Sequence, residues 1–584
     1  MKDRLLFLSL LAVVVGLLGG LVAEGLLLTI NLLNNILFFH RVSDSFPTAM
    51  VLSHWWMILL PAAGGFLVGL IVQYFSPEIK GDGIPEAMAV VLTNRSIVKP
   101  RVGFFKPLSA AITVGTGGPF GAEGPIIQTG GALGSILSQF IPSSPSERRT
   151  LLACGAAAGL AGVFKTPFAG VMMAVELLVF EFRARSFIPI AIASATGTMV
   201  AMVFRGAGAV FPLQTGFQFH LLELPFFVVL GVLCAGLAWV MTRTLYICED
   251  FFEHMTEHWH VWFPLIPALG GLVVGGIAWF YPQVLGTGYA VIADVLAKPH
   301  PMHVLVGIGL AKLLAFGVAL GAGCSGGTFA PALMIGGSLG AAYGSLVHMI
   351  LPTSSSIGLY GMVATAALFG SVYRATPSAI LFMLEVTGAY HAMLPCFLVA
   401  VISDLAVHHF MRTTINTERL VRRGTLVPEA YSVDPMRLMR VRDIMSPELE
   451  SVRKDRKVGE FLADVIHHSV VPVVDAQDRY VGVLHRARLV EASEVTTADE
   501  LTERAYPTVY EDDVVHDVVV RLLKDGYKAF PVLDRKTGDL VGMVTAFDVL
   551  KSKNWEIGQD MPEPGRLWGL AMARFNTRSS RSAE

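Results

Sequence analysis

The residues that could do chemistry gather in a glycine-rich stretch from Gly115 to Gly134, which carries one carboxylate, Glu123. Glycine lets the backbone turn sharply and expose its N–H groups, and Pro125 suits the first turn of a helix. The free N–H groups and the dipole of a helix start attract an anion. An ionisable side chain inside a bilayer is costly and usually functional. The stretch therefore predicts an anion site in which Glu123 competes with the anion.

The pattern recurs in the second half of the chain. After Pro125, and again after Pro331, two glycines, a leucine and a glycine follow at positions +5, +6, +8 and +9. A basic residue also lies 11 positions before a glutamate twice, at Glu176 and at Glu385. Paired apolar segments interrupted by glycine and proline indicate the binding site of a transporter, although the glycines alone fit equally well with close packing between helices. The repeats predict a duplicated membrane domain.

The composition is that of a polytopic membrane protein. Of 584 residues, 53% are hydrophobic and 15% charged, and the mean hydropathy is +0.59, which excludes an ordinary soluble domain. The formal net charge of -2 gives no argument for nucleic acid as a partner. The five cysteines are scattered without metal-ligand spacing, which predicts buried free thiols and no metal site.

Apolar runs define the expected membrane helices. Residues 5–39 contain one charge, Glu24, and at about 1.5 Å per residue they would form a tilted helix of about 50 Å against a bilayer core of about 30 Å. Several later runs are too short to cross a bilayer, which predicts helices that break at mid-membrane. The His-rich segment 245–260 is interpreted as an interfacial loop in preference to a metal site.

The composition changes after Met411, where four arginines between 412 and 423 indicate a cytoplasmic exit. The following part predicts a soluble α/β module with a repeat of about 60 residues and strand pairs at 470–474 with 480–484 and at 529–533 with 540–544. The expected boundaries are a membrane domain over 1–425, a linker over 426–436, two repeats over 437–495 and 496–557, and a disordered tail over 558–584.

Three motifs make the chain resemble the CLC family of chloride channels and chloride/proton antiporters. They are Gly81-Asp82-Gly83-Ile84-Pro85, Gly121-Ala122-Glu123-Gly124-Pro125 and Gly327-Thr328-Phe329-Ala330-Pro331, in the family's order. Lys106 and Lys312, 17 and 16 positions before Glu123 and Thr328, also match family positions. The resemblance covers roughly residues 5–425, and the soluble module is similar to a pair of CBS domains, a common appendage of the family.

The resemblance implies a polytopic α-helical membrane protein with the inverted-repeat CLC fold and a small cytoplasmic α/β CBS pair. It also implies a homodimer with one pore per subunit and Glu123 as the gate. An ionised Glu123 would occupy the anion path, and a protonated or displaced one would open it. The positions that match the family's anion site are Asp82, Gly83, Ile84, Gly121, Gly124, Thr328, Phe329 and Asn416.

The sequence departs from the family pattern at four positions. Asp82 replaces a serine, and an ionised Asp82 must point away, be protonated or pair with a cation; a simple cap on its own helix start is the competing interpretation. Ala122 replaces a basic residue, Asn416 the pore tyrosine, and Leu177 the internal glutamate that carries protons in many antiporters. Glu181 could substitute for that glutamate, but a helix cap is the preferred interpretation.

In the second CBS repeat, Thr545 and Asp548 match the signature with which such pairs hold a nucleotide. The threonine would bind phosphate and the aspartate the ribose. The first repeat has His485 and Arg488 at these positions, so one adenosine nucleotide (ATP, ADP or AMP) per chain is expected. A CBS pair that serves only as a dimer scaffold is the alternative.

Taken with the resemblance, these residues imply anion permeation, chiefly of chloride, in the cell membrane and no enzymatic activity. The preferred interpretation is a voltage- or pH-gated channel. It is favoured by the missing internal glutamate, by the missing pore tyrosine and by Ala122. Glu123 favours the alternative, a chloride/proton antiporter. A CBS-regulated cation transporter, suggested by Asp82, is the remoter alternative. The expected partners are small anions, membrane lipid and a second subunit.

Overall fold

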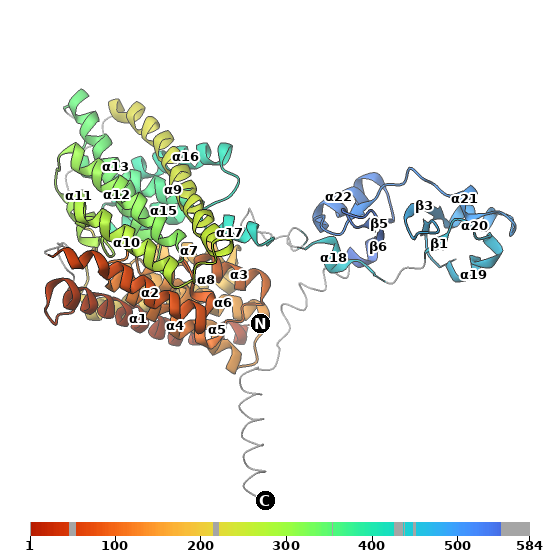
Figure 1. Cartoon of the computed structure of the whole chain (residues 1–584), viewed down its shortest axis with the longest axis horizontal. Helices are drawn as coiled ribbons and strands as arrows, with labels where there is room; N and C mark the ends of the chain where they lie inside the picture. The colour runs from red at the N-terminus through yellow and green to blue at the C-terminus, as the bar shows by residue number, and fades with distance from the viewer. Residues whose placement is uncertain are drawn as a thin grey trace, which may run out of the picture. The chain divides into compact units, whose positions relative to one another are not determined.

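The computed structural model describes residues 2–45, 54–213, 221–352, 354–425, 436, 439–447, 451–465 and 467–549. The chain divides into one compact unit over Met1–Thr425 and a second over Leu426–Met561. Figure 1 shows that helices build the first unit and that the second unit contains small sheets.

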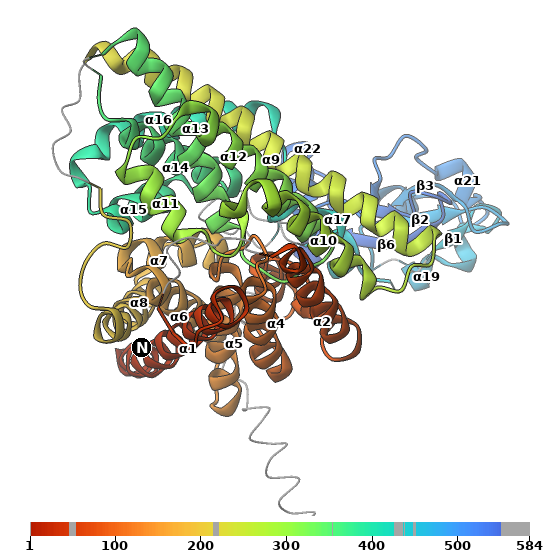
Figure 2. The ribbon, with the colours of Figure 1, turned by 60° about the vertical axis from the view of Figure 1, so that its left-hand side comes forward.

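The first unit consists of two runs of helices in matching order. The first run is α1 (Lys2–Phe39), α2 (Leu60–Tyr74), α3 (Ile84–Thr93), α4 (Pro100–Gly115), α5 (Glu123–Phe140), α6 (Pro145–Phe164), α7 (Pro167–Ala174) and α8 (Ala184–Arg205). The second is α9 (Leu224–His258), α10 (Leu265–Phe280), α11 (Tyr289–Ala297), α12 (Met302–Gly321), α13 (Phe329–Ile350), α14 (Ile357–Tyr373), α15 (Thr376–Thr387) and α16 (Met393–Phe410). Figures 1 and 2 show the first run, coloured red to tan, beside the second, coloured yellow to cyan. Long and short helices alternate alike in both runs, in agreement with the expected duplication.

Seven helical segments of the described part are long and apolar enough to cross a membrane, among them Arg4–Phe39 and Leu221–His258. Residues 5–39 form one continuous helix, as expected. The short helices α3, α7, α11 and α15 have only 8 to 12 residues. At about 1.5 Å per residue they are too short to cross a bilayer core of about 30 Å, in agreement with the expected broken helices.

The expected interfacial loop at 245–260 is wrong, because α9 continues as a helix to His258. Leu245, Tyr246 and Phe252 are buried, so one face of the helix stays apolar beyond the membrane-spanning part. His254 and His258 stack one turn apart on this helix with ring centroids 4.0 Å apart.

The repeated glycines lie at helix contacts. A side chain at Gly134 would place its Cβ 1.9 Å from the carbonyl oxygen of Leu151, between α5 and α6. A Cβ at Gly340 would lie 2.3 Å from that of Ala364, between α13 and α14. Both distances are far inside van der Waals contact. These glycines therefore serve the close packing of helices, which is one of the two interpretations of the repeated pattern.

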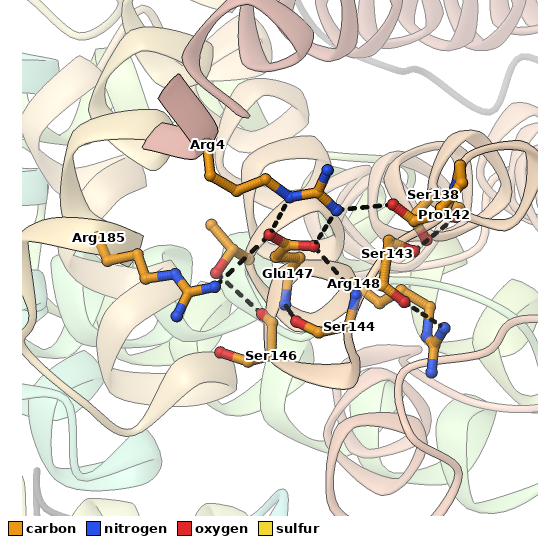
Figure 3. Close-up of polar contacts among 10 residues, drawn as sticks. Arg4, Ser138, Pro142, Ser143, Ser144, Ser146, Glu147, Arg148 and Arg185 are labelled. Atoms are coloured by element: carbon orange, nitrogen blue, oxygen red, sulfur yellow. Dashed lines mark hydrogen bonds and ion pairs between the residues drawn. The ribbon is translucent and has the colours of Figure 1, made fainter. Parts of the chain in front are cut away.

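Figure 3 shows how one carboxylate ties the start of α6 to α1 and α8. Glu147 is buried, and its oxygens accept hydrogen bonds from Nε of Arg4 at 2.7 Å and Nη2 of Arg4 at 2.9 Å. It also accepts from the backbone N–H of Ser144 at 3.0 Å, and the Ser144 hydroxyl accepts from the Glu147 N–H at 3.2 Å. This is a capping box. Arg185 in α8 approaches the same carboxylate to 3.5 Å.

Two further carboxylates join the halves of the unit at α7 and α15. Glu176 lies in a π-helical turn (Val175–Val179) after α7 and accepts from the backbone N–H of Ser378 at 3.2 Å and from its hydroxyl, near the start of α15. Glu385 in α15 accepts from the N–H groups of Phe168 at 3.0 Å and Ala169 at 2.8 Å, at the start of α7. Each short helix thus caps the other, which gives a structural reason for the repeated glutamate.

The second unit contains two three-stranded sheets of the same design. In each sheet the first strand is parallel to the central strand, which pairs antiparallel with the third. The sheets are β1 (Val452–Arg453), β2 (Val470–Val474) and β3 (Tyr480–His485), then β4 (Val509–Tyr510), β5 (Ala529–Leu533) and β6 (Leu540–Thr545). The helices are α18 (Val441–Ile444), α19 (Leu462–Val465), α20 (Arg486–Glu491), α21 (Ala498–Leu501) and α22 (Val515–Asp525). The two expected strand pairs are confirmed.

We expect Glu147→Ala to lower the free energy of unfolding of the first unit by about 1–3 kcal/mol, because it removes charged hydrogen bonds and a helix cap together. Arg185→Ala removes the 3.5 Å contact with Glu147 but leaves the Arg4 hydrogen bonds and the capping box in place, so it should cost less than about 1 kcal/mol. Thermal unfolding of the purified protein in detergent measures both variants. Equal losses would show that Glu147 does not anchor these helices.

Candidate functional site

Glycine-containing breaks between the helices meet and hydrogen-bond to one another through their backbones. The N–H of Gly121 donates to the carbonyl of Gly327 at 3.0 Å, and the N–H of Gly327 returns the bond at 2.9 Å. The N–H of Gly326 donates to the carbonyl of Gly81 at 3.2 Å. The N–H of Gly286, in the break before α11, donates to the carbonyl of Gly117, in the break before α5, at 3.2 Å. The N-termini of helices from both runs therefore lie close together.

Two buried lysines hold these breaks in shape. Lys106 in α4 is 0% exposed, and its Nζ donates to the carbonyls of Ile79 at 3.0 Å and Gly81 at 2.7 Å. Lys312 in α12 is also 0% exposed and donates to two carbonyls of the break before α11, at 2.8 and 3.1 Å. This correspondence identifies Gly286-Thr287-Gly288 as the second copy of Gly81-Asp82-Gly83.

Glu123 begins α5 and is fully buried at the meeting point of two breaks. Its Oε1 accepts a hydrogen bond from the Tyr289 hydroxyl at 2.6 Å, whereas its Oε2 has no hydrogen-bond partner among the described residues. A Cβ at Gly121 would lie 1.7 Å from this Oε2, so a side chain there would expel the carboxylate. A Cβ at Gly327 would lie 2.8 Å from the same oxygen. The Glu123 carboxylate thus occupies the crossing between the starts of α5 and α13.

Asp82 lies beside this crossing and does not point away from it. It is 3% exposed, and its Oδ1 accepts from the backbone N–H of Thr328 at 2.9 Å, just before α13. A Cβ at Gly124 would lie 2.2 Å from the same oxygen. The residue that precedes α3 as its N-cap is Gly83, and no side chain caps that helix. The competing interpretation, in which Asp82 only caps its own helix start, is therefore wrong, because its carboxylate takes a donor of the opposite helix run that would suit an anion.

Two tyrosines that the sequence analysis did not select complete the site. Tyr289 is the first residue of α11 and follows the second Gly-x-Gly copy directly, so alignment of the two halves would have found it. Tyr373 is the last residue of α14; its hydroxyl donates to that of Thr328, and its ring centroid lies 4.8 Å from that of Phe329. No sequence pattern marks Tyr373, which reaches the site only through the packing of α14 against α13.

Asn416 is buried just before α17 (Thr417–Arg422), and its Nδ2 lacks a hydrogen-bond partner within the described ranges. The backbone N–H of its neighbour Ile415 donates to the carbonyl of Val372 at 3.3 Å. This bond places Asn416 beside the end of α14 that carries Tyr373. A tyrosine on a neighbouring segment therefore accompanies the asparagine that replaces the family's pore tyrosine.

The remaining predicted positions lie at the helix starts where the motifs place them. All are buried: Gly83, Ile84, Gly121, Gly124, Thr328 and Phe329. Ala122 and Leu177 are buried as well. Glu181 lies 3.5 Å from both Arg149 and Arg183, so arginines engage it away from the crossing.

The predicted nucleotide residues form a closed local cap in the second unit. Oδ2 of Asp548 accepts from the Thr545 N–H at 2.9 Å and from its hydroxyl at 2.6 Å, while Oδ1 accepts from the Ser446 hydroxyl at 3.1 Å. Asp548 is 4% exposed. A ribose would have to displace Ser446 in order to reach this carboxylate.

Comparison with known proteins identifies both units. The family model described as voltage gated chloride channel matches residues 64–408, and the CBS domain model matches residues 441–495 and 498–553. The H(+)/Cl(-) exchange transporter ClcA of Yersinia pseudotuberculosis is 30% identical over 403 residues, which cover 67% of this chain and 82% of the relative. ClcA of Vibrio parahaemolyticus is 31% identical over 343 residues, or 58% and 73%. A ClcB-like chloride channel protein of Ralstonia nicotianae is 29% identical over 381 residues, or 64% and 88%.

Solved structures share the fold. A slow cyanobacterial Cl-/H+ antiporter superposes with a TM-score of 0.65 at 24% identity, covering 71% of this chain and 97% of that one. A eukaryotic CLC transporter superposes with a TM-score of 0.62 at 20% identity, covering 94% and 99%. The expected architecture is confirmed as a polytopic helical CLC fold with C-terminal α/β CBS domains. Because the family model also matches more than half of the sequence, the chain belongs to the CLC family of chloride channels and transporters.

Proposed function

We propose that this CLC-family anion transporter exchanges chloride for protons and that chloride competes with the ionised Glu123 carboxylate for one place, a competition that a proton on Glu123 removes. Exchange is preferred here to the channel that the sequence favoured, because the Yersinia and Vibrio relatives are named H(+)/Cl(-) exchange transporters. One observation carries the proposal. Glu123 is 0% exposed at the crossing, with one oxygen on Tyr289 and the other without a partner among the described residues.

A carboxylate and a chloride ion need the same surroundings. The N–H groups and dipoles at the starts of α5 and α13 favour negative charge at the crossing. While Glu123 is ionised it fills that place, and a proton that neutralises it removes the competition with chloride. Proton binding and anion binding are therefore coupled in free energy. The proposed anion contacts are Asp82, Gly83, Ile84, Gly121, Gly124, Thr328, Phe329 and Asn416.

The proposal includes the placement of the protein. The arginines between 412 and 423 favour a cytoplasmic side for the end of α16 and hence for the CBS pair. The multi-pass unit would lie in the cell membrane. We also propose a homodimer with one pore per subunit, as the family resemblance implies.

Purified protein in liposomes under a chloride gradient should drive protons against their own gradient, recorded together as chloride and pH changes. Glu123→Gln keeps the shape of the side chain but cannot ionise, so proton movement should fall at least tenfold and chloride flux should lose its pH dependence. Tyr289→Phe removes the 2.6 Å donor to Glu123 and keeps the aromatic ring. This control should retain coupled movement with a shifted pH dependence.

The same liposomes separate the alternatives. Wild-type chloride flux without any proton movement would contradict exchange and establish a channel. Flux that persists after every permeant anion is replaced by a large organic anion would indicate cation transport instead.

A second part of the proposal is that an adenosine nucleotide binds weakly at Thr545 and Asp548. Support comes from the match to the CBS domain model and from the place of both residues at the end of β6. The nucleotide must compete with Ser446 for Oδ1 of Asp548. A nucleotide that binds two conformations differently shifts their populations by that difference.

Calorimetric titration of the full-length protein with ATP, ADP or AMP should show about one weak site per chain. Asp548→Ala should abolish the heat, whereas Ser446→Ala should preserve or tighten binding because it frees Oδ1 of Asp548. Heat that is equal in the native protein and Asp548→Ala, or absent from the native protein, would leave the CBS pair as a scaffold.

A further inference from the structure

A cavity of about 700 Å³ lies between α3, α5, α9 and α17. Carboxylates and arginines line it together, among them Glu86, Glu249, Arg419 and Arg423. A cavity of this size and polarity can hold many water molecules and so deliver protons to any carboxylate in its wall.

Among the carboxylates that line the cavity, Glu86 lies nearest in the chain to the transport site. It lies in the first turn of α3, four positions after Asp82, and is 9% exposed. Its Oε1 lies 3.6 Å from Arg419 and 3.7 Å from Arg423, while its buried Oε2 has no hydrogen-bond partner in the described part of the chain. Arg419 also lies against the break that carries Asp82, because a Cβ at Gly81 would lie 2.4 Å from its Nη1.

Asp82 in turn is separated from Glu123 by little more than the backbone of Gly124. A Cβ at Gly124 would lie 2.2 Å from Oδ1 of Asp82, and a Cβ at Gly327 would lie 2.8 Å from both the Gly124 nitrogen and Oε2 of Glu123. Oδ2 of Asp82, like Oε2 of Glu123 and Oε2 of Glu86, is buried without a partner among the described residues. Three carboxylates therefore follow one another from the cavity to the crossing, each with one oxygen able to take a proton.

A cation lies close to each of the three carboxylates or to the backbone beside it, so the ionised form is tolerated as well as the protonated form. Arg419 and Arg423 lie within 3.7 Å of Glu86. Lys106 donates to the carbonyl of Gly81 next to Asp82, and Lys312 donates to the carbonyl of Gly286, close to the Tyr289 that binds Glu123. A group that alternates between the two forms can carry protons.

We propose that Asp82 is the internal proton carrier of this protein, loaded from the cavity through Glu86 and discharging to Glu123; this rests on the exchange function proposed above. A hydronium ion in the cavity gives a proton to Oε2 of Glu86 and is left as a water molecule. That O–H bond then breaks as one forms at Oδ2 of Asp82, and the same transfer follows to Oε2 of Glu123, directly or through a water molecule. Only protons move, and each carboxylate returns to its ionised form. Asp82 thereby carries the proton, which the apolar side chain of Leu177 cannot do.

The test uses the full-length protein in liposomes, with proton and chloride flux recorded together. Asp82→Asn keeps an oxygen for the Thr328 N–H but cannot carry a proton, so the ratio of proton to chloride flux should fall at least tenfold. Asp82→Ser, which is the family's residue, should give the same loss and guards against a folding defect of the first variant. Glu86→Gln should lower the ratio for the same reason.

Glu249→Gln is the matched control, because Glu249 lines the same cavity and holds Arg419 at 2.8 Å but belongs to α9 and not to α3, which follows Asp82. Its flux ratio should stay within twofold of the wild type. A wild-type ratio in Asp82→Asn and Asp82→Ser would overturn the carrier and leave exchange standing. A wild type that moves chloride but no protons would overturn both the carrier and the exchange function. If Glu249→Gln lowered the flux ratio as much as Glu86→Gln, Glu86 would have no specific role in loading Asp82.

Discussion

The backbone hydrogen bonds between the glycine breaks are the constraint on which the rest of the structure depends. An unpaired backbone group inside a bilayer costs several kcal/mol, so helices can stop there only where protein satisfies their ends. The bonds between Gly121 and Gly327 satisfy one such pair of breaks. Lys106 and Lys312 satisfy carbonyls in the two others at the cost of burying two charges. The need for these partners explains why lysines and glycines stand at matching places in the two halves.

The helix starts that the breaks create are filled by the protein's own carboxylates. Glu176 and Glu385 cap α15 and α7 reciprocally and close the contact between the two halves. Asp82 takes the N–H of Thr328 before α13. Glu123 and Asp82 differ from the first pair in a way that matters, because each keeps one buried oxygen without a partner among the described residues. Such a group is tethered in an anion site yet remains free to take a proton, and this is what exchange requires.

The sequence predicted the helical membrane unit, the duplicated halves and the strand pairs of the second unit, because each rests on a local pattern of apolar residues, glycine and proline. The resemblance to the CLC family also implied which helix starts meet. The sequence could not predict the direction of Asp82, since the donor that holds it lies 246 positions away at Thr328. The sequence could not predict the place of Tyr373 in the site either, because that place arises from the packing of α14 on α13. The segment 245–260 was misjudged because its charged and histidine residues obscure a helix that continues to His258 and has buried residues as far as Phe252.

The central claim is that chloride and the ionised Glu123 carboxylate compete for one place, and proton release or uptake on chloride binding tests it most directly. Chloride is added to the purified protein in weakly buffered detergent solution while the pH is recorded. Displacement of the carboxylate raises its affinity for a proton, so binding should take up protons and raise the pH, and Glu123→Gln should bind chloride without this change. Chloride binding to the native protein with no change in pH would contradict the account.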